Sequence, residues 1–337
     1  MRGSASYYYG HRYQIGTQAT YSYMLVACLF CWLSGYLNST GYPVYGEVVA
    51  PPLWNTLCTL MPGKSLTYLI GFVLMLGGAF FVHRANYALM LIREKSYLPF
   101  LLYALFVSTN PNFFPLKATS VGVFCLILAL YQLFISYHDP ESSDKAFQAA
   151  LLIGCGSLLW VHILWFLPLF WIGMYNFRNL SIRSFCASLL GVCTVYWFVL
   201  GWCVYTHNYL PITMPFNVLF KIRLLSMIGV NAIDWIQILL VTMLTVLASV
   251  NILTHEYEDN LRTRQFLAFL ILLFGWSFAQ FFFFEQSSEE FLAISCVPAA
   301  ILTAHFFTVK RGKYYFWLFH TSMLLLVMLL VVRLWSF

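Results

Sequence analysis

Charged side chains are scarce in this chain, and those beside long apolar runs are the first candidates for chemistry. Glu47 lies between Gly46 and an apolar piece, where partial burial could make its carboxylate basic enough to act as a general base. Arg333 stands in the otherwise apolar run LLLVMLLVVRLWSF, and Lys221 and Arg223 lie between two other runs. Cations at such places could bind a lipid phosphate. The alternatives are a solvated loop acid at Glu47 and, at Arg333, a side chain that extends to the lipid headgroups.

Other titratable residues at or within the runs have plainer interpretations. Four further acids lie at run ends: Asp234, Glu285, Glu289 and Glu290. Acids are favoured at helix starts by the helix dipole, and the last three also suit a solvated hairpin. Three histidines lie within runs: His162, His305 and His320. Their spacing places no two ligands on one helix face, so we predict no metal site, and no motif indicates a cofactor.

The elements that would position these residues must be membrane helices. The chain is 61% hydrophobic and 9% charged with a mean hydropathy of +0.77, whereas soluble domains carry roughly 25% charged residues. The net charge of +6 could suggest nucleic acid, but the basic residues are scattered between apolar runs rather than gathered on one face. We therefore predict an all-α, polytopic transmembrane bundle that binds no nucleic acid.

Runs of about 20 apolar residues suffice to cross a bilayer. Eight runs meet this requirement: Tyr21–Leu37, Leu66–His83, Ala118–Tyr137, Ser184–Thr206, Ala232–Leu253, Gln265–Phe284, Phe291–Val309 and Tyr314–Trp335. Two regions are ambiguous. Tyr97–Val107 is short and ends in the breaker cluster Ser108–Asn112, so it could cross or re-enter. Ala146–Tyr175 is long for one span, and we divide it near Trp160–His162 into a hairpin of two short helices.

Lys and Arg accumulate in cytoplasmic loops, which gives an independent test of the topology. Counting both ambiguous regions as crossings gives about eleven spans, with the N-terminus inside and the C-terminus outside. Thirteen of the 18 basic residues then lie inside. This topology comprises a polar cytoplasmic segment, 1–20, and one transmembrane domain, 21–335, with outer loops at 38–65 and 207–231. Each outer loop contains a predicted interfacial or re-entrant helix, one of them over Val48–Met61.

Two resemblances extend this interpretation. The stretches Arg93–Ile135 and Ala146–Val204, with LAISCVPAAILTAHFF at Leu292–Phe307, resemble a family of uncharacterised polytopic membrane proteins of Bacteroidota. That resemblance implies a multi-pass protein of the bacterial inner membrane. The order of a first span, an outer loop with an acid, and a hairpin-rich bundle is similar to GT-C-type glycosyltransferases. This second resemblance implies that Glu47 acts as base and that late basic residues such as Arg333 bind the phosphate of a polyprenyl-phosphate-linked sugar. The Asp typical of that loop and a second acid are absent.

Two hypotheses of different classes follow. In the first, the protein is a GT-C-like transferase, with Glu47 as catalytic base and Arg333, Lys221 and Arg223 binding lipid phosphate. In the second, it is a non-enzymatic scaffold, partner subunit or small-molecule transporter of an envelope complex. The first requires these residues to share one cavity on the outer side, and the second does not. The sequence names no protein partner.

Overall fold

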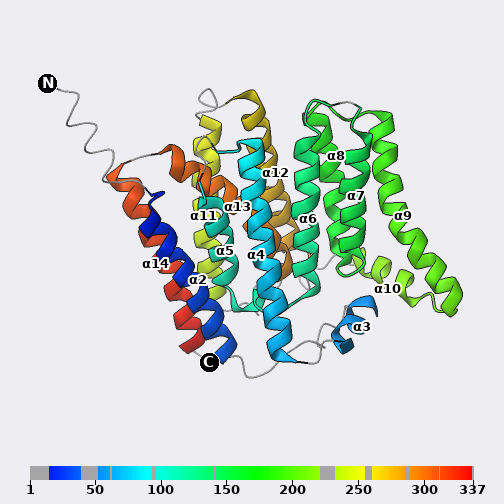
Figure 1. Cartoon of the computed structure of the whole chain (residues 1–337), viewed down its shortest axis with the longest axis horizontal. Coiled ribbons are helices and arrows are strands. Elements are labelled where there is room, and N and C mark those ends of the chain that lie inside the picture. Colours follow the sequence, from blue (N-terminus) through cyan, green and yellow to red (C-terminus); the bar gives the residue numbers. More distant parts are fainter. Residues whose placement is uncertain are drawn as a thin grey trace.

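A computed structural model describes residues 15–38, 52–60, 63–92, 96–139, 141–220, 232–254, 260–284, 288–310 and 312–335. It is an elongated bundle of helices, most of which run alongside one another (Figure 1). Within these ranges, eight helices are long and apolar enough to cross a membrane. They are α2 (Gln18–Asn38), α4 (Lys64–Leu89), α6 (Ala118–Ile135), α9 (Ile182–Thr206), α11 (Ala232–Thr254), α12 (Leu261–Phe283), α13 (Ser288–Val309) and α14 (Lys313–Trp335). The eight spans predicted from the sequence are confirmed as helices.

Helix α4 continues beyond its expected end at His83. No helix-breaking residue follows the apolar run, so the helix extends through Arg84 to Leu89 and ends where Met90 adopts a left-handed conformation, with φ of 51°. The charged residue Arg84 therefore ends the apolar run but does not end the helix.

Both ambiguous regions are helical. The first forms α5 (Leu98–Ser108), followed by the short 3-10 helix η1 (Pro111–Phe113). The second is divided near Trp160 as predicted, into α7 (Ser143–Ser157) and a 3-10 segment, η2 (Val161–Phe166), that continues as α8 (Leu167–Asn176). Helices also occur in both predicted outer loops, as α3 (Pro52–Leu60) and α10 (Leu210–Leu219). Residues 39–51, 61–62 and 221–231 of these loops lie outside the described ranges.

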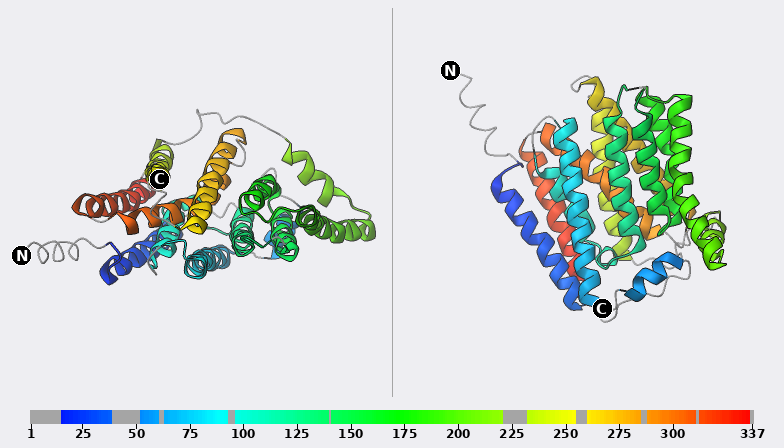
Figure 2. Two further views of the ribbon diagram at one scale, coloured as in Figure 1. Left: turned by 90° about the horizontal axis from the view of Figure 1, so that it is seen from above. Right: turned by 45° about the vertical axis from the view of Figure 1, so that its right-hand side comes forward.

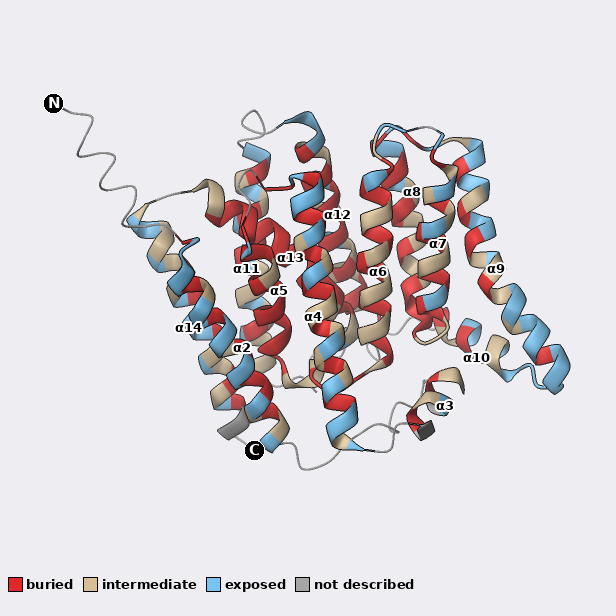
Figure 3. Ribbon diagram, in the orientation of Figure 1, coloured by how far each residue is buried: buried red, intermediate tan, exposed pale blue. Residues whose placement is uncertain are grey.

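Helix α5 lies in the middle of the bundle and packs against α2, α4 and α13. Its sequence, LPFLLYALFVS, is apolar on every face, and a helix of that kind is stable only when it is buried all round. Every residue of α5 except Phe100 is buried. Figure 3 shows buried residues concentrated in the central helices and exposed residues along α9.

The outer helices expose large apolar side chains. Helices α2 and α14 lie at one side of the elongated bundle, and α9 and α10 at the other (Figure 2). Helix α9 exposes Trp197, Phe198, Trp202 and Tyr205, and α2 exposes a similar apolar face. Soluble monomers rarely leave such continuous apolar surface open to water. This surface and the eight apolar helices indicate a membrane protein.

A glycine brings α4 against the segment that leads into α6. A Cβ at Gly71 would lie 2.5 Å from the Phe114 carbonyl oxygen, so only glycine permits this approach. Close to it, the backbone N–H of Leu116 donates to the carbonyl of Thr67 over 3.2 Å. The loop between η1 and α6 is thereby fixed to α4 seven residues after α4 begins, roughly 10 Å along its axis.

Candidate functional site

The segment from Ser108 to Asn112, called here the 108–112 turn, connects helices that are far apart in the sequence. It begins with the last residue of α5 and includes the first two residues of η1. Four of its residues each hydrogen-bond a side chain of a different helix: Trp32 Nε1 donates to Ser108 Oγ (2.9 Å), Gln237 Nε2 to Thr109 Oγ1 (3.0 Å), Arg333 Nη1 to Asn110 Oδ1 (3.0 Å), and Asn112 Nδ2 to Glu289 Oε1 (2.9 Å). The turn is therefore held by α2, α11, α14 and α13 together.

Arg333 belongs to a closed polar cluster. It is only 5% exposed, and its guanidinium forms an ion pair with Asp234, in the first turn of α11, besides the hydrogen bond to Asn110. The Asp234 side chain is 18% exposed. Of the two interpretations of Arg333 from the sequence, a headgroup-facing side chain does not match this buried placement. A phosphate-binding role would have to displace partners within the protein.

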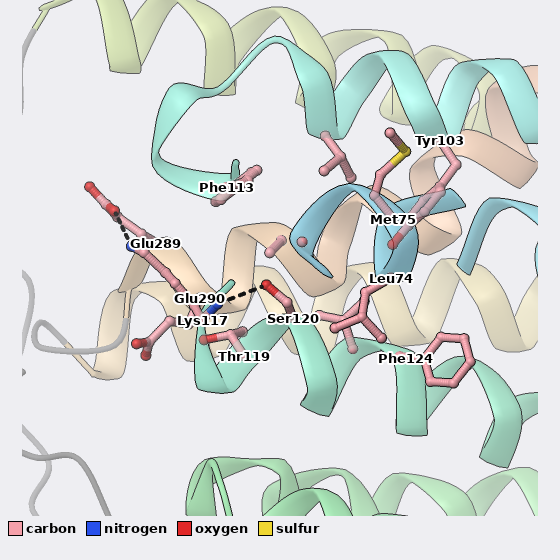
Figure 4. Close-up of a pocket in the computed structure, with 14 residues that line it drawn as sticks. Leu74, Met75, Tyr103, Phe113, Lys117, Thr119, Ser120, Phe124, Glu289 and Glu290 are labelled. Atoms are coloured by element: carbon pink, nitrogen blue, oxygen red, sulfur yellow. Dashed lines mark hydrogen bonds and ion pairs between the residues drawn. The ribbon is translucent and has the colours of Figure 1, made fainter. Parts of the chain in front are cut away.

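A pocket lies on the other side of the turn, bordered by α4, α5, α6 and α13 (Figure 4). It contains about 560 Å³ of space between atoms, which includes space open to the surroundings. Its walls are mainly apolar: Leu74, Met75, Val107, Phe113, Val123, Phe124 and Ala293. Lys117, Glu289 and Glu290 lie together at one end and Tyr103 lies at the other (Figure 4). We call the charged end the pocket mouth.

The charged residues of the mouth come from two helix starts. Lys117 precedes α6 in an extended conformation, and its backbone N–H donates to Ser120 Oγ over 3.3 Å, which caps the helix. Glu289 and Glu290 occupy the first turn of α13, where the helix dipole favours acids. Lys117 Nζ lies 3.9 Å from Glu289 Oε2. Trp160 Nε1 donates to Glu290 Oε2 over 3.1 Å.

One hydroxyl group of the pocket wall lacks a partner. Thr119 is 3% exposed, and its Oγ1 is buried without a hydrogen-bond partner among the described residues. A buried hydroxyl without a partner costs about 1–3 kcal/mol. Such a cost is recovered when a ligand supplies the missing partner.

The residues proposed from the sequence are only partly placed. Glu47, Lys221 and Arg223 lie outside the described ranges, so their positions relative to the pocket stay predictions. Arg333 lies in the buried cluster described above. Sequence reasoning did not single out Lys117 or Thr119 as site residues, although the breaker cluster at 108–112 marked the place where these elements meet.

The three histidines of the apolar runs lie on three different elements, η2, α13 and α14. His162 is buried between the rings of Trp160, Phe284 and Phe291. His320 Nδ1 lies 2.8 Å from the carbonyl oxygen of Phe316 in its own helix. Across the ranges that the structure describes, no three His, Cys, Asp or Glu side chains come together as metal ligands.

Comparisons with known proteins give no relative on which to base a function. No family model matches the chain, no curated protein matches it, and no solved structure resembles it closely enough to count as a match. The function must therefore be argued from the site itself.

Proposed function

We propose that the chain crosses the bacterial inner membrane about eleven times, with its N-terminus in the cytoplasm and its C-terminus outside. The eight long helices account for most crossings, and α5, α7 and η2–α8 lie alongside them (Figure 1). Described basic residues divide unequally between the two ends of the helices. One end has Arg84, Lys145, Arg178, Arg183, Arg262, Arg264, Lys310 and Lys313, and the other has Lys64, Lys117 and Arg333. The richer end is the cytoplasmic one in this topology.

The short elements explain how a pocket forms below the outer surface. Helix α5 has 11 residues, about 16 Å at 1.5 Å per residue, against about 30 Å for the hydrocarbon core. Irregular backbone at membrane depth is tolerated where it is buried in protein or lines a cavity. The 108–112 turn is held within the protein, because its side chains bond to four helices. Phe113, directly after the turn, lines the pocket.

On this basis the protein binds an amphipathic, lipid-like molecule at its outer face. The observation that carries this proposal is the polarity of the pocket, which has apolar walls, a charged mouth and the partnerless Thr119 hydroxyl. A fully polar ligand would place polar groups against apolar walls. A hydrocarbon would place apolar groups against the charged mouth and leave the Thr119 hydroxyl without a partner. An amphiphile satisfies both.

Filling the pocket tests this proposal. Ala293 lines it, so Ala293→Leu places extra side-chain volume inside it. We expect the purified variant in detergent to retain at least tenfold less phospholipid than the wild type, measured by native mass spectrometry across a lipid titration. The matched control is Ala187→Leu, a half-buried alanine on α9. Equal lipid retention by all three proteins would contradict the proposal.

The transferase hypothesis is a narrower form of the same function, since a polyprenyl-phosphate-linked sugar is also an amphiphile. It needs Glu47 as base and Lys221 and Arg223 at the phosphate, all outside the described ranges. Arg333 already pairs with Asp234 and Asn110. We therefore base the proposal on lipid binding, with sugar transfer as one further possibility and a scaffold, subunit or transport role as the non-enzymatic one.

A further inference from the structure

Two consecutive hydroxyl side chains in the first turn of α6 line the pocket, and they have different uses. Ser120 Oγ accepts a hydrogen bond from the backbone N–H of Lys117 over 3.3 Å, so it caps the helix. Thr119 is 3% exposed, and its Oγ1 has no hydrogen-bond partner in the described part of the chain. Capping does not use the Thr119 hydroxyl, which leaves it to a ligand.

Thr119 lies between the charged and the apolar parts of the pocket. Along α6, the lining residues run from Lys117 at the mouth through Thr119 to Phe124 in the apolar wall (Figure 4). Helix α6 has 18 residues, about 27 Å at 1.5 Å per residue, which nearly matches the hydrocarbon core of about 30 Å. In the proposed topology, the first turn of α6 therefore lies at the outer boundary between headgroups and hydrocarbon. The ester groups of glycerolipids lie at the same depth.

The surroundings of Thr119 favour an uncharged acceptor. Its hydroxyl is a neutral donor, and the pocket walls beyond the mouth are mainly apolar. Burying a charge costs far more than burying a neutral polar group, which one hydrogen bond can satisfy. An ester carbonyl accepts such a hydrogen bond and carries no charge. This match does not involve the charges of the mouth, where Lys117 and Asn112 already engage the two oxygens of Glu289.

We propose that the pocket recognises an acyl ester of a glycerolipid, whose carbonyl oxygen accepts a hydrogen bond from Thr119 Oγ1. The acyl chain lies along the apolar wall formed by Leu74, Val123 and Phe124, and the headgroup lies toward the mouth. Polyprenyl phosphates contain no carboxylic ester, so they fall outside this ligand class. The assignment rests on the proposed lipid-binding function and specifies its ligand.

The test compares two phosphatidylcholines that differ only in their linkages, one with ester-linked hexadecanoyl chains and one with ether-linked hexadecyl chains. Each is titrated into the detergent-solubilised full chain and followed by native mass spectrometry. We expect the ester lipid to bind about tenfold more tightly, because the ether lipid fills the same walls but has no carbonyl oxygen for Thr119. A water-soluble phosphatidylcholine with two butanoyl chains keeps the esters and should bind at least about a hundredfold more weakly, since it buries less hydrocarbon.

Two variants assign the preference to the hydroxyl of Thr119. Thr119→Val removes the donor and should reduce the preference for the ester lipid to less than about threefold. Thr119→Ser retains a hydroxyl and should keep the preference near about tenfold. The matched control is Thr194→Val on α9, where an exposed hydroxyl donates to the Leu190 carbonyl of its own helix. This control should also keep the wild-type preference.

The outcomes separate the ester assignment from the proposed function. Equal binding of the ester and ether lipids, with binding still lost in Ala293→Leu, would overturn the ester assignment and leave the lipid pocket intact. A preference that persists in Thr119→Val would overturn the role of Thr119. No lipid binding, or binding unaffected by Ala293→Leu, would overturn both proposals. A dibutanoyl lipid that binds as tightly as the long-chain ester would overturn the membrane-lipid source and point to a soluble ester.

Discussion

Two polar clusters at the same end of the bundle have nearly the same composition and different surroundings. Each contains a cation, an acid and an asparagine of the 108–112 turn. In one, Arg333 pairs with Asp234 and bonds Asn110, and the two charged side chains are 6% and 18% exposed. In the other, Lys117 lies near Glu289, which accepts a hydrogen bond from Asn112. The side chains of Lys117 and Glu289 are 28% and 51% exposed.

The difference in burial assigns them different roles. A buried ion pair is satisfied only by its own members, because removing one leaves an uncompensated charge away from water. An exposed pair contributes little to stability and can exchange partners. The Arg333 cluster therefore fixes the bundle, and the Lys117 cluster is free to bind a ligand.

The largest expected effect is at Arg333. Arg333→Met leaves the Asp234 carboxylate buried without its cation, and we expect it to lower the free energy of unfolding by about 3–5 kcal/mol. The measurement is an unfolding titration with a denaturing detergent. The double variant Arg333→Met with Asp234→Leu removes both charges and should recover most of the loss. A double variant as unstable as the single one would show that the loss does not come from the uncompensated Asp234 charge.

A smaller effect of opposite sign is expected at Thr119. Thr119→Val replaces the partnerless hydroxyl with a methyl group of similar shape, and should stabilise the lipid-free protein by about 1 kcal/mol in the same titration. The matched control is Thr109→Val, which removes the acceptor for Gln237 and should destabilise the protein by a similar amount. Destabilisation by Thr119→Val would mean that its hydroxyl is satisfied without a ligand.

The smallest effect is expected at the mouth. Lys117→Gln should change the free energy of unfolding of the lipid-free protein by less than about 0.5 kcal/mol, since exposed ion pairs contribute little. The same titration measures it, with Lys145→Gln as the control. A loss of about 2 kcal/mol or more would make the mouth a second structural cluster and remove the contrast with Arg333.

Most of the helices follow from local sequence, and the site does not. Long apolar runs are sufficient to predict spans such as α11, and the breaker residues Asn110 and Pro111 correctly predicted where α5 ends. The partners of the 108–112 turn depend on the packing of the whole bundle. Arg333 and Asn110 are 223 positions apart, and no periodicity relates them. The local sequence does not distinguish Thr119 either, because whether its hydroxyl has a hydrogen-bond partner depends on the surrounding helices.

The four-helix attachment of the 108–112 turn has a consequence for biosynthesis. The chain is made from its N-terminal end, so α5 is inserted well before α11, α13 and α14 exist, and Arg333 is synthesised 223 residues after Asn110. Of the four partner side chains described above, Trp32 of α2 alone is present to bond the turn during that interval. Its other polar groups must be covered by water or by the insertion machinery until the later helices arrive. Assembly of the pocket is therefore a late event, coupled to the arrival of the last helices at the bundle.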